Sequence, residues 1–257
     1  MKNLQYDILS SCNFSLRHYF EVLENARNNY DYVGSLKGLS TVKKKDKFIV
    51  LRHDVDISLE HALKIAHLES KHDLHSTFFI LLHSPFYNAL ARKSANIISR
   101  ISKLGHEIGL HYDTTFLPKS LSNAHKQLKN EIRILENISG QKIISVTQHN
   151  PTTTVKMNLK LTSGFLDAMH NILTKNAMYI SDSVQNWRKG CMCNHVGKIN
   201  KLQILTHPIW WQEVPMSIDK ILKNMSTNQN IYMNSEFKFL EDFYKNYLFD
   251  VKNNPNR

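Results

Sequence analysis

Short apolar runs alternate along the chain with segments in which apolar residues recur every three or four positions. The uninterrupted runs predict strands buried on both faces, and the spaced pattern predicts amphipathic helices. The predicted strands cover residues 48–51, 77–82, 107–111, 142–147, 178–180 and 202–205. The predicted helices cover residues 59–68, 94–104, 122–138, 164–175 and 218–248. Gly105 and Gly140 stand where the second and third helices should end.

Strands that alternate with helices favour a parallel sheet with helices on its outside. The chain has 257 residues, enough for one large α/β domain. The number of strand–helix units and the lack of a linker favour a single barrel over two domains. We expect residues 1–45 to lead into this domain, residues 46–215 to form the barrel core and residues 216–257 to form a helical C-terminal segment.

The formal net charge of +11 is compatible with three kinds of partner: nucleic acid, an anionic membrane surface or an acidic substrate. The charge is spread out, with one tight lysine cluster at residues 43–47, and no nucleic-acid recognition motif accompanies it. We therefore expect no nucleic-acid partner. The first residues lack an apolar signal core and no stretch approaches a membrane span, so a cytoplasmic protein is expected, with peripheral membrane contact left open.

The three cysteines are Cys12, Cys191 and Cys193. An odd, sparse set does not make a disulfide framework. Cys191 and Cys193 are separated by one residue, whereas structural zinc sites typically use a two-residue gap, and there is no second pair. We interpret them as reduced loop thiols without an assigned role.

Carboxylates and imidazoles follow the predicted strands at the point where each strand ends. Active sites of parallel barrels gather at these carboxyl ends, so we expect the side chains to converge. They are Asp54, Asp56, His111, His149, Asp182 and His207. Asp54 and Asp56 are two residues apart and can face the same side of an extended chain. The alternative is a solvated strand end at which one aspartate caps the next helix.

His207 follows the last predicted strand and precedes the pair Trp210 and Trp211. A histidine in this position can protonate a leaving amine as a general acid. The tryptophans either pack beneath it as core aromatics or stack on a sugar ring.

Five short motifs occur in an order that resembles the polysaccharide deacetylases of the chitooligosaccharide deacetylase type. They are His53-Asp54-Val55-Asp56, Ser76-Thr77-Phe78-Phe79, Gly105-His106-Glu107-Ile108-Gly109-Leu110-His111, Asp182-Ser183 with Trp187, and Leu205-Thr206-His207-Pro208. The resemblance runs from about Val50 to Trp211. It implies a distorted (β/α)7 barrel as a single domain, here with a helical C-terminal tail.

The resemblance also implies a role for each matching residue. Asp54 matches the catalytic base, Asp56 the metal-binding carboxylate and His111 the first metal histidine. His207 matches the histidine that protonates the departing amine. Asp182 and Trp187 match substrate contacts in the pocket wall, and Trp210 and Trp211 are further substrate-binding candidates. Tyr87, in the loop after the second strand, lines the pocket rim or packs within the loop.

The family's second metal histidine lies four residues after the first, where this chain has Thr115. Asp113, two residues after His111, is one candidate for the third ligand, and His149 from the fourth strand is the other. We favour Asp113 as the ligand and His149 as the partner that orients the catalytic base. A third interpretation is that the metal site is lost and that the fold only binds sugar.

Carboxylate and imidazole donors suit Zn²⁺ first, with Fe²⁺, Co²⁺ or Ni²⁺ as alternatives. The expected function is therefore metal-dependent N-deacetylation of an amino sugar. The basic charge suits a nucleotide- or lipid-linked precursor of a surface polysaccharide. The alternatives are a catalytically silent sugar-binding protein on the same fold, and a deformylase or another amidase.

Overall fold

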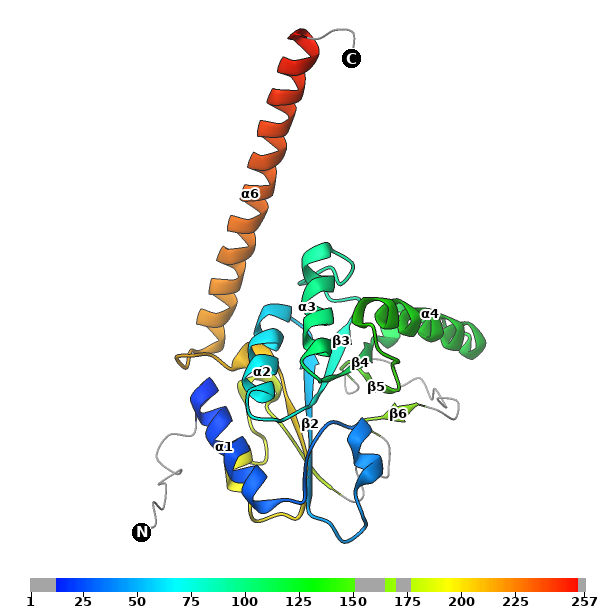
Figure 1. The fold of residues 1–257 in the computed structure, drawn as a ribbon, viewed down its shortest axis with the longest axis vertical. Helices are drawn as coiled ribbons and strands as arrows, with labels where there is room; N and C mark the ends of the chain where they lie inside the picture. Colours follow the sequence, from blue (N-terminus) through cyan, green and yellow to red (C-terminus); the bar gives the residue numbers. More distant parts are fainter. Residues whose placement is uncertain (1–12, 151–164, 170–176, 254–257) are drawn as a thin grey trace. The chain divides into compact units, whose positions relative to one another are not determined.

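In the computed structural model, a curled sheet of parallel strands forms the core of the part of the chain that precedes the C-terminal helix (Figure 1). The structure describes residues 13–150, 165–169 and 177–253. The strands of the main sheet are β2 (Phe48–Val55), β3 (Thr77–Leu81), β4 (Glu107–Tyr112), β5 (Ser145–Gln148), β6 (Leu166–Asp167), β7 (Met178–Ser181) and β8 (Lys201–Thr206). Together with the helices outside them they confirm the predicted distorted (β/α)7 barrel.

The strand order within the described residues is β6-β5-β4-β3-β2-β8-β7, and every neighbouring pair is parallel. A short strand, β1 (Tyr32–Gly34), pairs with the first half of β2. β2 and β8, the first and last strands of the main sheet, are therefore neighbours, with His53 opposite Thr206. This pairing brings residues 54–56 next to residue 207 at one edge of the sheet.

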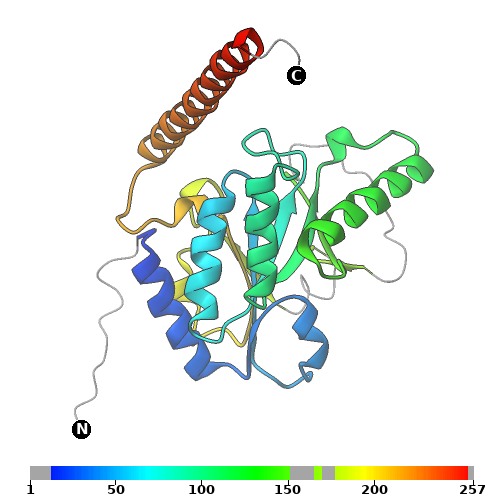
Figure 2. The ribbon, with the colours of Figure 1, turned by 45° about the horizontal axis from the view of Figure 1, so that its top comes forward.

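Helices cover the outside of the sheet. α1 (Leu16–Asn29), α2 (Leu59–Ser70), α3 (Arg92–Lys103) and α4 (Leu121–Ser139) pack against one another in this order. Figures 1 and 2 show α1, α2 and α3 side by side in front of the strands. The central strand β2 is covered along its whole length, with all eight of its residues buried. This accounts for the uninterrupted apolar runs in the sequence.

Two glycines end helices as the sequence predicts. Gly105 follows α3 with a φ angle of +93°, and Gly140 follows α4 with a φ angle of +71°. Residues with a Cβ rarely adopt these left-handed conformations, so glycine lets the chain leave the helix without strain. At Gly105 the chain turns directly into β4, which carries His111.

The predictions for residues 142–147 and 164–175 need correction. The strand in the first region, β5, begins at Ser145. In the second region, residues 166–167 form strand β6 rather than a helix, because they pair with β5 through Leu166–Ser145 and Asp167–Val146. The remainder of the predicted helix lies largely outside the described residues.

The chain divides into two compact units, Met1–Pro215 and Met216–Arg257. The second contains the predicted C-terminal helix, α6 (Ile218–Asn253), on which many large apolar side chains between residues 231 and 244 are exposed. Among the described residues, no helix combines the length and hydrophobicity that crossing a bilayer requires.

Candidate active site

A cavity of about 510 Å³ opens at the carboxyl ends of the barrel strands. Most of the polar residues expected from the strand ends line it, together with basic residues from the loop after β7. The lining residues used below are Arg52, Asp54, Asp56, His111, His149, Tyr179, Arg188, Lys189 and His207. The sequence-based expectation that strand-end residues converge is therefore met for Asp54, Asp56, His111, His149 and His207.

Asp56, His111 and His149 bring three potential donor atoms together. Oδ1 of Asp56 lies 3.3 Å from Nε2 of His111 and 3.5 Å from Nδ1 of His149. The two histidine nitrogens are 3.3 Å apart. The three atoms thus form a nearly equilateral triangle at the edge of the cavity.

Neighbouring groups orient both histidines of this triangle. Nδ1 of His111 donates to the carbonyl oxygen of Thr147 at 3.1 Å, which leaves Nε2 on the side of the ring that faces Asp56 and makes it the potential metal-binding nitrogen. The side-chain amide of Asn150 lies 2.9 Å from Nε2 of His149 and holds the other side of that ring. Burial alone would raise the pKa of Asp56, but the imidazoles of His111 and His149 hold it well below its usual range.

The triangle fits a divalent cation. Oδ1 of Asp56 is buried and accepts no hydrogen bond from the described residues, although a buried carboxylate oxygen normally has a partner. Zinc–nitrogen and zinc–oxygen bonds of ~2.0–2.1 Å imply donor–donor separations of ~3.3–3.4 Å around a tetrahedral ion. The observed separations of 3.3, 3.3 and 3.5 Å match these values.

Asp54 forms an ion pair with Arg52, two residues earlier on β2, in which the guanidinium contacts both carboxylate oxygens. Nη2 of Arg52 lies 2.8 Å from Oδ1 and 2.7 Å from Oδ2 of the carboxylate, and Nε lies 3.2 Å from Oδ1. Both side chains are buried, and the guanidinium lies over the ring of Phe79. The arrangement fixes the orientation of the Asp54 carboxylate 3.5 Å from Nε2 of His111.

His207 is held by a fully buried carboxylate. Its Nδ1 donates to Oδ1 of Asp182 at 2.7 Å, and its Nε2 lies 3.7 Å from Oδ2 of Asp56. The backbone NH of His207 and the indole NH of Trp211 also donate to Asp182. Burial alone would lower the pKa of His207, but the hydrogen bond and charge of Asp182 raise it to about 9. A pKa in this range favours the protonated imidazole at neutral pH.

Asp113 does not join the triangle, contrary to the interpretation we favoured from the sequence. The alternation of side chains that would aim it at His111 ends with β4 at Tyr112. Asp113 instead caps the short helix η3 (Thr114–Phe116), and its Oδ1 accepts hydrogen bonds from both the backbone NH and the hydroxyl of Thr115. The structure brings His149 to this position, and it is Arg52 that pairs with Asp54.

Four residues predicted as substrate contacts take other positions. Among the described residues that line the cavity, Tyr87, Trp187, Trp210 and Trp211 do not appear. Tyr87 donates to the carbonyl oxygen of Val55 at 2.6 Å, which agrees with packing within the loop. Trp210 and Trp211 are buried, and Trp187 stacks on Phe14. Asp182 lies behind His207 instead of forming the pocket wall.

Several cavity residues were not predicted from the sequence. Arg52 could have been found, because an arginine inside a fully buried strand requires an anionic partner and Asp54 lies two residues away. Arg188 and Lys189 lie at the exposed side of the cavity, in the loop after β7. They belong to no motif, and only the fold brings them to the site.

No family model and no curated protein matches the chain. Among solved structures, the peptidoglycan deacetylase PdaC from Bacillus subtilis is 18% identical over 76% of this chain and 99% of its own, with a TM-score of 0.46. A family 4 carbohydrate esterase from Bacillus anthracis is 17% identical over 87% of this chain and 90% of its own, with a TM-score of 0.46. A pseudoenzyme of the same esterase family from Bacillus anthracis is 16% identical over 74% of this chain and 63% of its own, with a TM-score of 0.42.

Proposed function

We propose that the protein is a metal-dependent amide hydrolase that removes the N-acyl group, acetyl in the first instance, from an amino sugar. The observation that carries this proposal is the placement of three functional groups around one cavity. These groups are the triangle of Asp56, His111 and His149, the Arg52–Asp54 pair, and the Asp182–His207 pair.

Asp56, His111 and His149 would hold the divalent cation, for which Zn²⁺ is the first candidate. When bound, such a cation supplies a Lewis acid that polarises the amide carbonyl. Asp54 accepts a proton from the attacking water, and Arg52 keeps its carboxylate ionised and oriented. His207 donates the proton on Nε2 to the leaving nitrogen as the carbon–nitrogen bond breaks. The products are the free carboxylate and the amine.

The charge of Asp182 should set the pH at which His207 loses its proton. Replacing Asp182 by asparagine removes this charge, so the pKa of His207 should fall by ~1–3 units. Because His207 acts in its protonated form, the alkaline limb of the pH–rate profile should move to lower pH by a similar amount. The profiles of kcat for the wild type and Asp182→Asn measure this shift.

Trp211→Phe serves as a control for the Asp182 experiment, since it removes a hydrogen-bond donor to Asp182 but leaves the carboxylate charge. Its alkaline limb should stay where the wild type has it. An unshifted limb in Asp182→Asn, measured in a folded and active variant, would exclude His207 as the general acid.

The exposed cations of the cavity support a substrate that carries phosphate, such as a nucleotide- or lipid-linked sugar. Arg188 and Lys189 line the cavity, and the whole chain has a formal net charge of +11.

Arg188→Ala should therefore raise KM for a phosphate-bearing amino sugar about 5-fold, as expected for one exposed charge pair. Arg133→Ala, an exposed arginine on α4 outside the cavity lining, is the matched control and should leave KM unchanged.

A substrate panel tests the proposed reaction itself. N-acetyl and N-formyl amino sugars, each with and without a sugar phosphate, should be compared with a neutral chitin-type oligomer. We expect release of acetate to be fastest from the phosphate-bearing sugar. Preferential release of formate would favour a deformylase, and activity confined to the neutral oligomer would contradict the proposed substrate class. Binding of sugar without any turnover by metal-loaded protein would favour a silent sugar-binding protein.

A further inference from the structure

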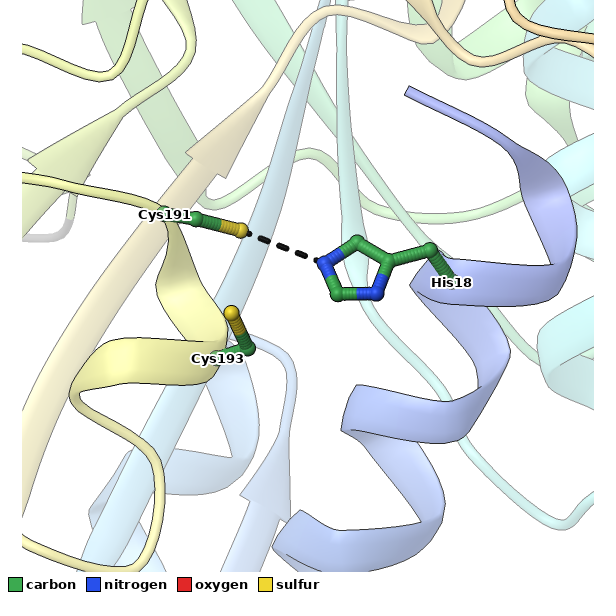
Figure 3. A group of neighbouring side chains, drawn as sticks. All are labelled: His18, Cys191 and Cys193. Carbon is green, nitrogen blue, oxygen red and sulfur yellow. Dashed lines mark hydrogen bonds between the residues drawn. The ribbon is translucent and has the colours of Figure 1, made fainter. Parts of the chain in front are cut away.

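A second group of potential metal ligands lies outside the cavity. It consists of His18, Cys191 and Cys193, which Figure 3 shows pointing toward one another. Nε2 of His18 lies 3.3 Å from Sγ of Cys191, and the three potential donor atoms lie within 4.8 Å of one another. None of these residues belongs to the cavity lining, so the group is separate from the proposed active site.

The fold brings these side chains together from distant parts of the chain. His18 stands in the first turn of α1, where its backbone NH donates to the hydroxyl of the capping residue Ser15. Cys191 and Cys193 belong to the loop between β7 and β8, at the start of the short helix η5 (Met192–Asn194). Gly190, with a φ angle of +86°, lets the chain turn sharply into this helix.

The surroundings of the three side chains suit a bound cation. His18 and Cys191 are buried, whereas Cys193 is partly exposed and leaves a route for an ion. Met192, between the two cysteines, is fully buried and anchors the turn.

The distance between His18 and Cys191 can be compared with that expected for a zinc site of mixed sulfur and nitrogen ligands. Zinc bonds of ~2.3 Å to sulfur and ~2.1 Å to nitrogen imply a sulfur–nitrogen separation of ~3.6 Å around a tetrahedral ion. The His18–Cys191 separation of 3.3 Å is close to this value. Sγ of Cys193 lies within 4.8 Å of the other two donor atoms, so a shift of this partly exposed side chain would bring it to the ion as a third protein ligand.

We propose that His18, Cys191 and Cys193 bind a Zn²⁺ ion that ties the start of α1 to the loop between β7 and β8. The same loop carries Arg188 and Lys189 of the cavity. An ion at this place stabilises the folded loop because it binds the folded state more tightly than the unfolded chain. Its role is therefore structural, and it does not depend on the reaction proposed for the cavity.

Cobalt substitution separates this site from the one in the cavity. Thiolate ligands give Co²⁺ an intense charge-transfer absorption in the near ultraviolet, whereas a site of carboxylate and imidazole does not. We expect this absorption when the reduced, metal-free full-length protein is titrated with CoCl₂. His111→Ala should retain it, and Cys193→Ser should lose it while keeping its circular dichroism spectrum. His18→Gln should weaken Co²⁺ binding, as measured by the intensity of the same absorption band.

The third cysteine provides the control for the cobalt experiment. Cys12 lies outside the described residues, and Cys12→Ser should retain the thiolate absorption. Absence of the band in fully reduced wild-type protein would overturn the proposal. Retention of the band in Cys193→Ser with loss in Cys12→Ser would overturn it too, because the thiolate would then come from Cys12.

Thermal unfolding gives a second measurement that involves neither absorption nor activity. Excess Zn²⁺ should raise the Tm of His111→Ala, because the cluster of His18, Cys191 and Cys193 remains intact in that variant. The same addition should leave the Tm of the double variant His111→Ala/Cys193→Ser unchanged. An equal rise in both variants would contradict a site at Cys193.

Discussion

Replacing His111 by alanine is expected to remove the metal from the cavity and to abolish deacetylation. His111 supplies one corner of the ligand triangle, and its hydrogen bond to Thr147 fixes the direction of Nε2. Loss of a group that only orients a ligand costs ~10–100-fold in metal affinity, so loss of the ligand itself should cost more than ~100-fold. Elemental analysis of protein purified without added metal measures this loss. Both proteins should also carry Cys193→Ser, so that the measured metal content does not include an ion bound by His18, Cys191 and Cys193.

Two companion variants identify the third ligand. His149→Ala should lose the metal as His111→Ala does, because Nδ1 of His149 lies 3.5 Å from Asp56. Asp113→Asn should keep it, because the Asp113 carboxylate is bonded to Thr115. The opposite result, with metal lost only in Asp113→Asn, would restore the ligand set favoured from the sequence. A parent protein that takes up no metal even after incubation with Zn²⁺ would favour a sugar-binding protein instead.

Much of the site could be predicted because it depends on strand positions alone. Buried parallel strands appear as uninterrupted apolar runs, and their carboxyl ends meet at one edge of the barrel. Asp54, Asp56, His111, His149 and His207 stand at the end of such runs or within a few residues after it, and all five line the cavity. The roles of these residues stay predictions, but their convergence follows from the fold.

The errors arise where the chain leaves regular structure. Asp113 was assigned by side-chain alternation, which applies inside a strand and ends with β4 at Tyr112. Residues 164–175 were predicted as a helix, yet the pairing of Leu166–Asp167 with β5 makes these two residues a strand. At Asp113 a local cap with Thr115 replaces the strand pattern, whereas at Leu166 and Asp167 a contact distant in the sequence overrides the local pattern.

Other features involve partners that local sequence does not bring together. His18 and Cys191 are 173 residues apart, and the unusual spacing of Cys191 and Cys193 hides any resemblance to a standard zinc motif. Trp210 and Trp211 had two interpretations, core packing or sugar stacking. Their burial and the hydrogen bond from Trp211 to Asp182 agree with packing beneath His207.

Asp54→Asn is expected to reduce kcat by a factor of ~10²–10⁴, the range for loss of a general base, while metal content stays unchanged. Asparagine has nearly the shape of aspartate and its amide oxygen can still accept a hydrogen bond from Arg52, but the amide cannot take a proton from water. The metal-ligand triangle does not use Asp54, so the ion should remain. Steady-state kinetics and elemental analysis on the same preparation measure both quantities.

Arg52→Lys separates the positioning of the base from the base itself. Lysine keeps the positive charge beside Asp54 but loses the two-pronged contact of the guanidinium, so the carboxylate remains a base that is less well oriented. We expect a kcat between those of the wild type and Asp54→Asn.

Unchanged turnover in Asp54→Asn would exclude Asp54 as the base. Loss of both metal and activity in Asp54→Asn would instead assign Asp54 to the metal centre. His111→Ala, measured for metal content and activity in the same way, shows the result expected when a ligand of that centre is lost.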